Sequence, residues 1–259
     1  MTTVLEAQLQ ETNGRTALFD RPVAPSLPPL TPEQEFVLLA RCLFAEGFDD
    51  HLSGHITYRQ PDGTFLVNPF GLTWDEIRPR DIARMDGDGN QLDGRWPITP
   101  AITLHVELHK ARHDVGVAIH NHCRWSTLWA DLGEAPPIYD QTGAIYGGDV
   151  ALYSEYHGPV DDARNARAAV EAMGDANIAL LANHGVFVLA ASVEQAYLRA
   201  MSFEWRCRQA WFLRSAGGGN PMDPEVAAAF GAYSLKSGFA AMFEAMARRE
   251  LRRDPRLLR

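Results

Sequence analysis

Hydrophobic residues recur with a helical period over several stretches of the chain. The clearest stretch, 31–47, starts with Thr31 and Pro32, carries Gln34 three positions after Thr31 and ends at Gly47. This pattern predicts a helix that begins with a capping box and stops at a glycine. The same period predicts helices over 74–86, 101–112, 124–133, 162–174 and 193–213, followed by a helical C-terminal region.

Short apolar or alternating stretches lie between these helices and indicate β-strands. The stretch 55–71 surrounds a Pro-Asp-Gly turn at 61–63, which predicts a β-hairpin. Further strands are expected over 115–122, 177–182 and 186–190, with a turn-rich edge over 87–98 and short strands and loops over 136–160. Helices that alternate with partly hairpin-linked strands predict an α/β fold in which helices cover both faces of one mixed sheet.

The first thirty residues differ from the rest of the chain because they end in the proline-rich stretch RPVAPSLPPL and hold little to bury. This composition predicts a flexible arm or linker over 1–30. No internal repeat is visible in 31–259. We therefore expect residues 31–259 to form a single domain with a C-terminal helical extension.

Composition disfavours several classes of protein. The 259 residues carry a formal net charge of −9, which argues against a nucleic-acid partner. No apolar run is long enough to cross a bilayer and the N-terminus lacks a signal-peptide pattern, so no membrane partner is expected. The cysteines, Cys42, Cys123 and Cys207, lack zinc-type spacing and indicate a reducing compartment, so we predict a cytoplasmic protein.

Two histidines lie one residue apart near the end of the predicted strand 115–122. Residues two apart on a strand point to the same face, about 6–7 Å from each other, so His120 and His122 project together. The small residues Gly116 and Ala118 precede them on that face. Two neutral imidazoles that converge on one point form half of a metal site. A hydrogen-bonded histidine pair near a sheet edge explains the same pattern.

A third histidine lies in the short connection between the last two predicted strands. His184 is followed by Gly185, which we expect to permit a backbone conformation that a residue with a Cβ would resist. A histidine held rigidly at the end of buried strands is suited to be a third ligand, and the alternative is a polar turn residue that faces solvent. His105 and His109 lie four apart on one predicted helix, and we interpret this pair as packing or solvated surface.

Five segments in this order resemble the class II aldolase/adducin family: 49–59, 65–77, 105–122, 156–160 and 180–196. The resemblance implies a three-layer α/β/α sandwich around a largely antiparallel mixed sheet. It also implies one divalent metal ion per subunit on His120, His122 and His184, and a homotetramer with the site close to a subunit boundary. Imidazole accepts Zn²⁺, Mn²⁺, Fe²⁺ and Co²⁺, of which we favour Zn²⁺.

The chain departs from the sugar-phosphate aldolases of that family and is closer to the adducin-like branch. Those aldolases carry an acid/base or metal-binding carboxylate where this chain has Ala101. They bind phosphate through polar groups at the positions of His55, Phe70 and the pair Thr99 and Pro100. A phenylalanine ring cannot donate to a phosphate oxygen and proline lacks a backbone N–H, so we predict a non-phosphorylated substrate.

The resemblance also supplies candidates for the remaining site residues. Catalytic members often use a tyrosine as proton donor, which makes Tyr139 a candidate, and His55 is a second one. Trp125 favours a flat aromatic substrate if it faces the metal, whereas its spacing from Trp129 is typical of core packing or an oligomer contact. The candidate substrate-binding residues are Phe70, Gly71, Thr99, Trp125 and Gln141.

These features predict a metal-dependent carbon–carbon lyase acting on a small, non-phosphorylated hydroxy- or oxo-carboxylate, aromatic acids included. Decarboxylation fits better than aldol cleavage because CO₂ leaves without a base. Two alternatives stay open. The first is a non-heme iron oxygenase that uses the same three histidines. The second is an adducin-like binding module without catalysis, against which the retained histidines argue.

Overall fold

The computed structural model describes residues 25–155, 162–236, 239 and 241–259. The chain divides into two compact units, Met1–Leu30 and Thr31–Arg259. Most of the predicted N-terminal arm lies outside the described residues, as does the segment 156–160 of the family resemblance. The arm and the single-domain organisation of 31–259 stay predictions.

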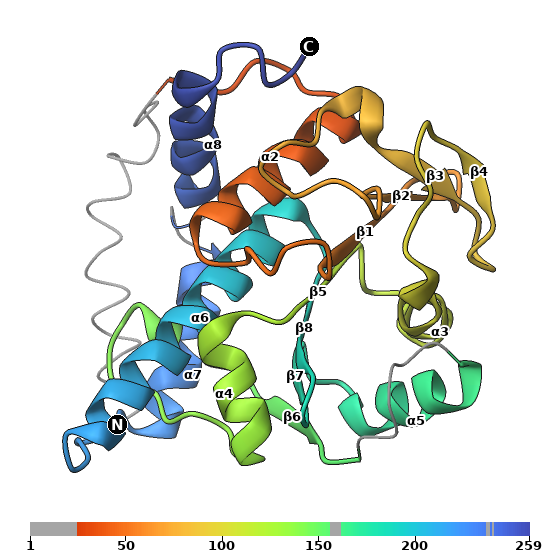
Figure 1. Cartoon of the computed structure of the whole chain (residues 1–259). Helices are drawn as coiled ribbons and strands as arrows, with labels where there is room; N and C mark the ends of the chain where they lie inside the picture. Colours follow the sequence, from red (N-terminus) through yellow and green to blue (C-terminus); the bar gives the residue numbers. More distant parts are fainter. Residues whose placement is uncertain (1–24, 156–161, 237–238, 240) are drawn as a thin grey trace. The chain divides into compact units, whose positions relative to one another are not determined.

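One eight-stranded sheet runs through the second unit in the order β4-β3-β2-β1-β5-β8-β7-β6 (Figure 1). Every neighbouring pair is antiparallel except β6 and β7, which are parallel. The strands are β1 (His55–Arg59), β2 (Phe65–Val67), β3 (Ala83–Met85), β4 (Gln91–Asp93), β5 (Val117–Asn121), β6 (Val150–Tyr153), β7 (Ile178–Leu181) and β8 (Gly185–Ala190). The predicted hairpin is thus β1 and β2.

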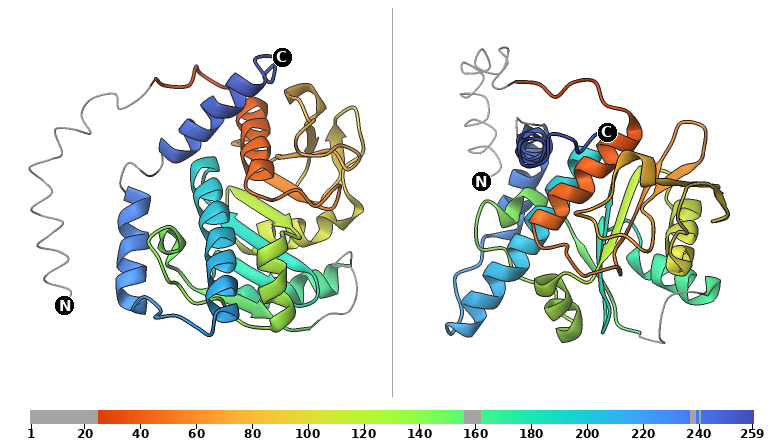
Figure 2. Two further views of the ribbon diagram at one scale, coloured as in Figure 1. Left: turned by 60° about the vertical axis from the view of Figure 1, so that its left-hand side comes forward. Right: turned by 45° about the horizontal axis from the view of Figure 1, so that its top comes forward.

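Helices lie on both faces of this sheet (Figures 1 and 2). The helices α3 (Thr103–Ala111) and α5 (Ala163–Met173) pack together on one face. The other face carries α2 (Pro32–Ala45), α4 (Arg124–Leu132) and α6 (Val193–Ser215). Outside these helices lie α7 (Pro224–Lys236) and α8 (Ala241–Arg253). Short 3₁₀ helices occur at η2 (Pro79–Asp81), η3 (Pro100–Ile102) and η4 (Gly143–Tyr146). The predicted three-layer α/β/α class is confirmed.

The first helix begins as its sequence predicts. The Gln34 amide N–H donates to Thr31 Oγ1 at 3.3 Å, and the Thr31 amide donates to Gln34 Oε1 at 3.0 Å. The hydrogen bonds satisfy two of the N–H groups at the start of this helix, where Pro32 has none. Gly47 follows the C-terminus with a φ of +100°, a conformation that favours glycine. Local sequence therefore sets both ends of α2.

The prediction of a helix over 74–86 is wrong. Only Pro79–Asp81 form a single 3₁₀ turn there, and Ala83–Met85 form β3, which pairs with β2. Pro79 cannot donate the hydrogen bond that a helix through it would need. The three residues after Ile82 gain sheet pairing instead, so tertiary contacts outweigh the apolar spacing.

We expect Thr31→Ala to lower the free energy of unfolding by about 1 kcal/mol, because the Gln34 amide loses its acceptor. Urea denaturation measures this change. Thr31→Ser keeps the hydroxyl and serves as the matched control, which should stay within about 0.5 kcal/mol of the parent chain. Equal stability of both variants would contradict a role for the capping box.

Candidate metal centre and active site

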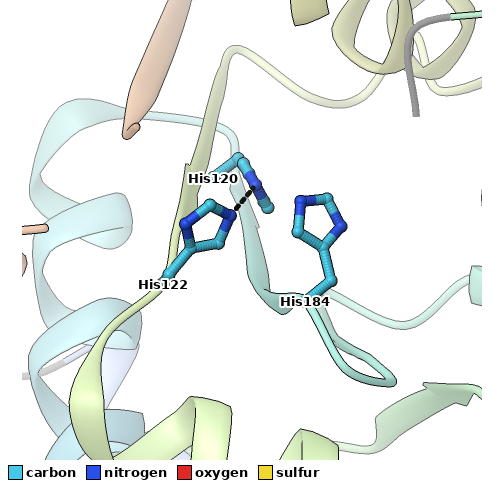
Figure 3. Close-up of side chains that lie close together, drawn as sticks. All are labelled: His120, His122 and His184. Carbon is cyan, nitrogen blue, oxygen red and sulfur yellow. Dashed lines mark hydrogen bonds between the residues drawn. The ribbon is translucent and has the colours of Figure 1, made fainter. Parts of the chain in front are cut away.

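Three histidine side chains converge at one end of the central strands (Figure 3). His120 lies on β5, His122 follows that strand and His184 lies in the turn between β7 and β8. The ring centroids of His120 and His184 are 4.7 Å apart, and those of the other two pairs are 4.9 Å apart. One nitrogen of each ring lies within 4.8 Å of the other two. The structure therefore brings together the three residues that the sequence groups as ligands.

Hydrogen bonds fix which nitrogen of two of these rings faces the cluster. His120 Nδ1 lies 3.1 Å from the Val186 carbonyl oxygen, and His122 Nδ1 lies 2.7 Å from Asp50 Oδ2. Both partners accept hydrogen bonds, so each Nδ1 carries a proton and each Nε2 presents a lone pair. A histidine that binds a metal usually donates its other ring N–H to a carboxylate or carbonyl oxygen in this way. Sequence reasoning missed Asp50, although it lies in one of the family-like segments.

The two Nε2 atoms of His120 and His122 lie 3.1 Å apart with no proton left to share. Two lone pairs at this distance repel each other unless a cation binds both. Nitrogens on one tetrahedral zinc ion are about 3.3 Å apart, given Zn–N bonds of about 2.0–2.1 Å. The donor set therefore fits a divalent metal ion, which His120, His122 and His184 would hold as neutral ligands.

The turn that carries His184 is constrained at the positions on either side of it. Asn183 has a φ of +54°, the left-handed conformation that asparagine tolerates. Gly185 resists a residue with a Cβ, as expected, although its φ does not lie in the left-handed region. A Cβ at Gly185 would instead lie 2.5 Å from the Asn121 carbonyl oxygen and 2.7 Å from a ring carbon of His122. Glycine is needed there because the turn passes so close to β5.

Burial keeps the histidine cluster in the protonation state that a metal needs. It lowers the pKa of His120 well below 6.5 and, together with the nearby His122, lowers the pKa of His184 to about 4. Burial raises the pKa of Asp50, but hydrogen bonds with His51 and His122 outweigh it and the net shift is downward. At neutral pH His120 and His184 are therefore neutral and the Asp50 carboxylate is charged.

A cavity of about 360 Å³ opens at the histidine cluster. None of its lining residues within the described part of the chain is an Asp, Glu, Lys or Arg. Ala101, Pro100 and Leu104 line it on the side of η3 and α3, and Phe70 lies at an exposed position. The remaining lining residues are Ser53, His55, Thr99, His120, His122 and His184. The cavity thus combines apolar walls with neutral polar groups.

A second row of polar side chains leads from this cavity into the core, between β1 and α3. His55 Nδ1 lies 2.9 Å from His105 Nε2, and Thr57 Oγ1 lies 2.8 Å from both His105 Nδ1 and His109 Nε2. Arg59 Nη2 ends the row, 3.2 Å from His109 Nδ1. We call His55, His105, Thr57, His109 and Arg59 the β1–α3 chain.

The surface interpretation of His105 and His109 is wrong, since both rings are buried and hydrogen-bonded. A signal was present in the sequence. Polar residues occupy the alternating positions 55, 57 and 59, and two histidines share one helix face. The two patterns become informative only when β1 and α3 are known to face each other.

Other predicted site residues lie away from the cavity within the described part of the chain. The Trp125 ring on α4 lies 5.4 Å from that of Phe212 on α6. Tyr139 lines a different cavity between α4 and α6, and Gln141 is exposed. Gly71 is exposed beside Phe70. Their assignment to substrate binding or catalysis stays a prediction.

The family model described as the class II aldolase and adducin N-terminal domain matches residues 34–211. The chain belongs to this family. One relative is a 4-hydroxy-3-prenylphenylpyruvate oxygenase/4-hydroxy-3-prenylbenzoate synthase of Streptomyces roseochromogenus subsp. oscitans. The two sequences are 31% identical over 189 residues, and the alignment covers 70% of this chain and 67% of the relative. The chain is 29% identical over 189 residues to the decarboxylase NovR of Streptomyces niveus, which covers 70% and 69%.

Solved structures of this family share the fold. The L-fuculose 1-phosphate aldolase from Glaciozyma antarctica PI12 superposes with a TM-score of 0.75 at 25% identity, over 90% of this chain and 97% of that chain. The fold and the family are therefore those implied by the sequence resemblance, whereas the relatives carry the names of different reactions. No helix among the described residues is long and apolar enough to span a bilayer.

We expect Asp50→Ala to weaken metal binding by about 10–100-fold, because His122 loses the carboxylate that orients it. Competition with a chromophoric chelator measures the affinity. Asp49→Ala, which removes the exposed neighbouring carboxylate, should bind metal as the parent chain does. Equal affinities for the two variants would show that the Asp50–His122 contact does not tune the site.

His109 supplies a pH test of the buried network. Burial and the Arg59 guanidinium lower the pKa of His109 to about 3, against about 6.5 in the unfolded chain. The unfolded chain therefore gains a proton below pH 6.5 that the folded chain does not, and stability falls as the pH falls toward 3. At pH 5 the loss from this ring is about 2 kcal/mol, at 1.36 kcal/mol per pH unit.

His109→Gln removes this titration, so the variant should lose about 2 kcal/mol less than the parent chain between pH 7 and pH 5. Urea denaturation at the two pH values measures the difference. His113→Gln, at an exposed position on the same segment, should keep the slope of the parent chain. Identical slopes for all three proteins would mean that His109 titrates normally in the fold.

Proposed function

We propose that this protein is a divalent-metal-dependent carbon–carbon lyase that acts on a non-phosphorylated hydroxy- or oxo-carboxylate, with decarboxylation as its reaction. The observation that carries the proposal is the cavity itself. Three neutral imidazoles lie at its base, and no charged side chain of the described residues lines it. Zinc is the metal we favour, and we propose a cytoplasmic homotetramer with the site close to a subunit boundary.

The metal ion, when bound, supplies a Lewis acid that stabilises negative charge on substrate oxygens. The chain's own contribution is to hold His120 and His184 neutral by burial, and to fix the Nε2 lone pairs of His120 and His122 through the hydrogen bonds at their Nδ1 atoms. The apolar lining residues Phe70, Pro100, Ala101 and Leu104 lower the polarity around the histidines, which strengthens electrostatic interactions there. Such an environment favours a reaction in which an anion forms on the substrate.

Ala101 supports decarboxylation over aldol cleavage. It lines the cavity where the sugar-phosphate aldolases carry their carboxylate, and a methyl group can neither accept a proton nor bind a metal. Loss of CO₂ leaves the electron pair of the broken C–C bond on the substrate and requires no base at that step. One proton must then return to that carbon, and Tyr139 and His55 are the candidate donors.

The first turn of η3 supports a substrate without a phosphate group. Pro100 has no amide hydrogen, and the Ala101 amide donates to Thr99 Oγ1 at 3.2 Å. Two backbone donors that could serve an anion at this helix start are therefore absent or engaged. Phe70 adds an aromatic surface at the cavity, which suits a flat or hydrophobic acid.

The names of two relatives support two different candidate functions. The decarboxylase NovR supports the lyase assignment. The oxygenase/synthase of Streptomyces roseochromogenus supports a second candidate, a non-heme iron oxygenase on the same three histidines, because neutral nitrogen ligands also hold Fe²⁺. The retained and oriented histidines argue against a binding module without catalysis.

The test is to purify the protein without chelators, determine its metal by elemental analysis and offer a panel of aromatic and aliphatic hydroxy- and oxo-carboxylates beside sugar phosphates. We expect about one metal ion per chain and CO₂ release from a carboxylate, with no cleavage of the sugar phosphates. His122→Ala should lose the metal and at least 100-fold of the activity. His113→Gln is the matched control and should retain both.

Two outcomes would overturn the lyase proposal. Stoichiometric metal with neither CO₂ nor aldehyde released from any carboxylate would exclude it. Oxygen consumption that requires iron and is not restored by zinc would establish the oxygenase instead. Cleavage of a sugar phosphate would contradict the substrate class.

A further inference from the structure

The β1–α3 chain has a direction that its arginine determines. A neutral imidazole donates through one nitrogen and accepts through the other, so a row of imidazoles can be protonated in either of two opposite orders. A guanidinium group only donates and stays protonated in proteins. Arg59 Nη2 therefore donates to His109 Nδ1, and His109 must carry its proton on Nε2.

The remaining contacts follow from this first assignment. His109 Nε2–H donates to Thr57 Oγ1, which leaves the threonine hydroxyl hydrogen for His105 Nδ1. His105 is then protonated on Nε2 and donates to His55 Nδ1. His55 in turn accepts on Nδ1 and carries its own proton on Nε2. The opposite order would need His109 to donate to the Val115 carbonyl oxygen and would place that N–H close to the N–H groups of Arg59 Nη2, 3.2 Å from His109 Nδ1.

Burial supports neutral rings along the row. It lowers the pKa of His105 well below 6.5, and together with Arg59 it lowers that of His109 to about 3. The Val115 carbonyl oxygen lies beside His109 as a second acceptor, whose hydrogen bond raises the pKa of that ring, and it also accepts from Arg59 Nε at 3.2 Å. The β1–α3 chain is therefore satisfied at each link with one proton per imidazole.

We infer that Arg59, His109, Thr57 and His105 are positioning residues that fix His55 as an Nε2–H donor facing the cavity. His55 would then bind a substrate oxygen by donating from Nε2. It is also unable to ligate the metal through Nε2. The ligand it takes is an anionic oxygen, a carboxylate in the substrate class to which the proposed function assigns this site.

Under this assignment His55 has a different role from the three candidate metal ligands. His120 and His122 present lone pairs on Nε2, whereas His55, which lines the same cavity with its ring 4.8 Å from that of His120, carries a hydrogen on Nε2. A carboxylate that binds the metal through one oxygen would find a donor for another.

The test is to determine the histidine tautomers directly. Protein labelled with ¹⁵N-histidine and loaded with zinc gives long-range ¹H–¹⁵N correlations that distinguish a protonated from an unprotonated ring nitrogen. His55→Gln, His105→Gln and His109→Gln assign the signals. We expect protonated Nε2 on His55, His105 and His109. Protonated Nδ1 on His55 or His109 would overturn the inference.

The variants Thr57→Val and Thr57→Ser separate direction from packing. Valine removes the hydroxyl that relays the order, so His55 should become a mixture of tautomers, and affinity for benzoate, used as the probe anion, should fall about tenfold. Serine keeps the hydroxyl and should restore both within twofold. Unchanged tautomers and benzoate binding in Thr57→Val would overturn the inference, whatever its effect on stability.

These readouts are independent of turnover. Predicted tautomers in a protein that releases no CO₂ would count against the proposed lyase function alone. CO₂ release by a protein whose His55 carries its proton on Nδ1 would count against this inference alone. Zinc content, measured for every variant, confirms that the metal ligands are intact.

Discussion

The antiparallel pairing of β5 with β1 and β8 determines where the functional side chains lie. In this register His120 lies opposite His55 on one neighbour and Phe187 on the other. The adjacent residue, Ile119, lies opposite Ile56 and Val188, all of which are buried. A slip by one residue would exchange the two faces of the strand. The apolar residues on one face therefore hold the imidazoles on the other.

The face of the sheet beneath α3 carries a polar row where an ordinary core would carry aliphatic side chains. Burying such groups is costly unless each is hydrogen-bonded. Here Thr57 hydrogen-bonds two histidines, and Arg59 ends the row with hydrogen bonds to the ring and to the carbonyl oxygen of His109. A fully satisfied row is rigid and admits one arrangement of protons. The hydrogen bonds that offset the cost of burying the β1–α3 chain thus also determine which nitrogen of His55 carries the proton at the cavity.

Sequence reasoning succeeded where the controlling interactions are local. The capping box of α2, the β1–β2 hairpin and the His120–His122 pair each depend on residues within a few positions of one another. It failed where a distant segment decides the outcome. The stretch 74–86 has helical spacing, but pairing with β2 makes part of it a strand. Asp50 becomes functional only because the fold brings it to His122, 72 positions away.

The same distinction separates the cluster of His120, His122 and His184 from the rest of the cavity lining. The three histidines are set by β5 and the β7–β8 turn, whereas Ala101 and Pro100 belong to η3, a separate element. Residues on η3 can therefore change without moving the three histidines. With a methyl group at Ala101, where the sugar-phosphate aldolases carry a carboxylate, a bound cation would be the dominant charge in the cavity. In apolar surroundings that charge acts most strongly on an anion formed next to it.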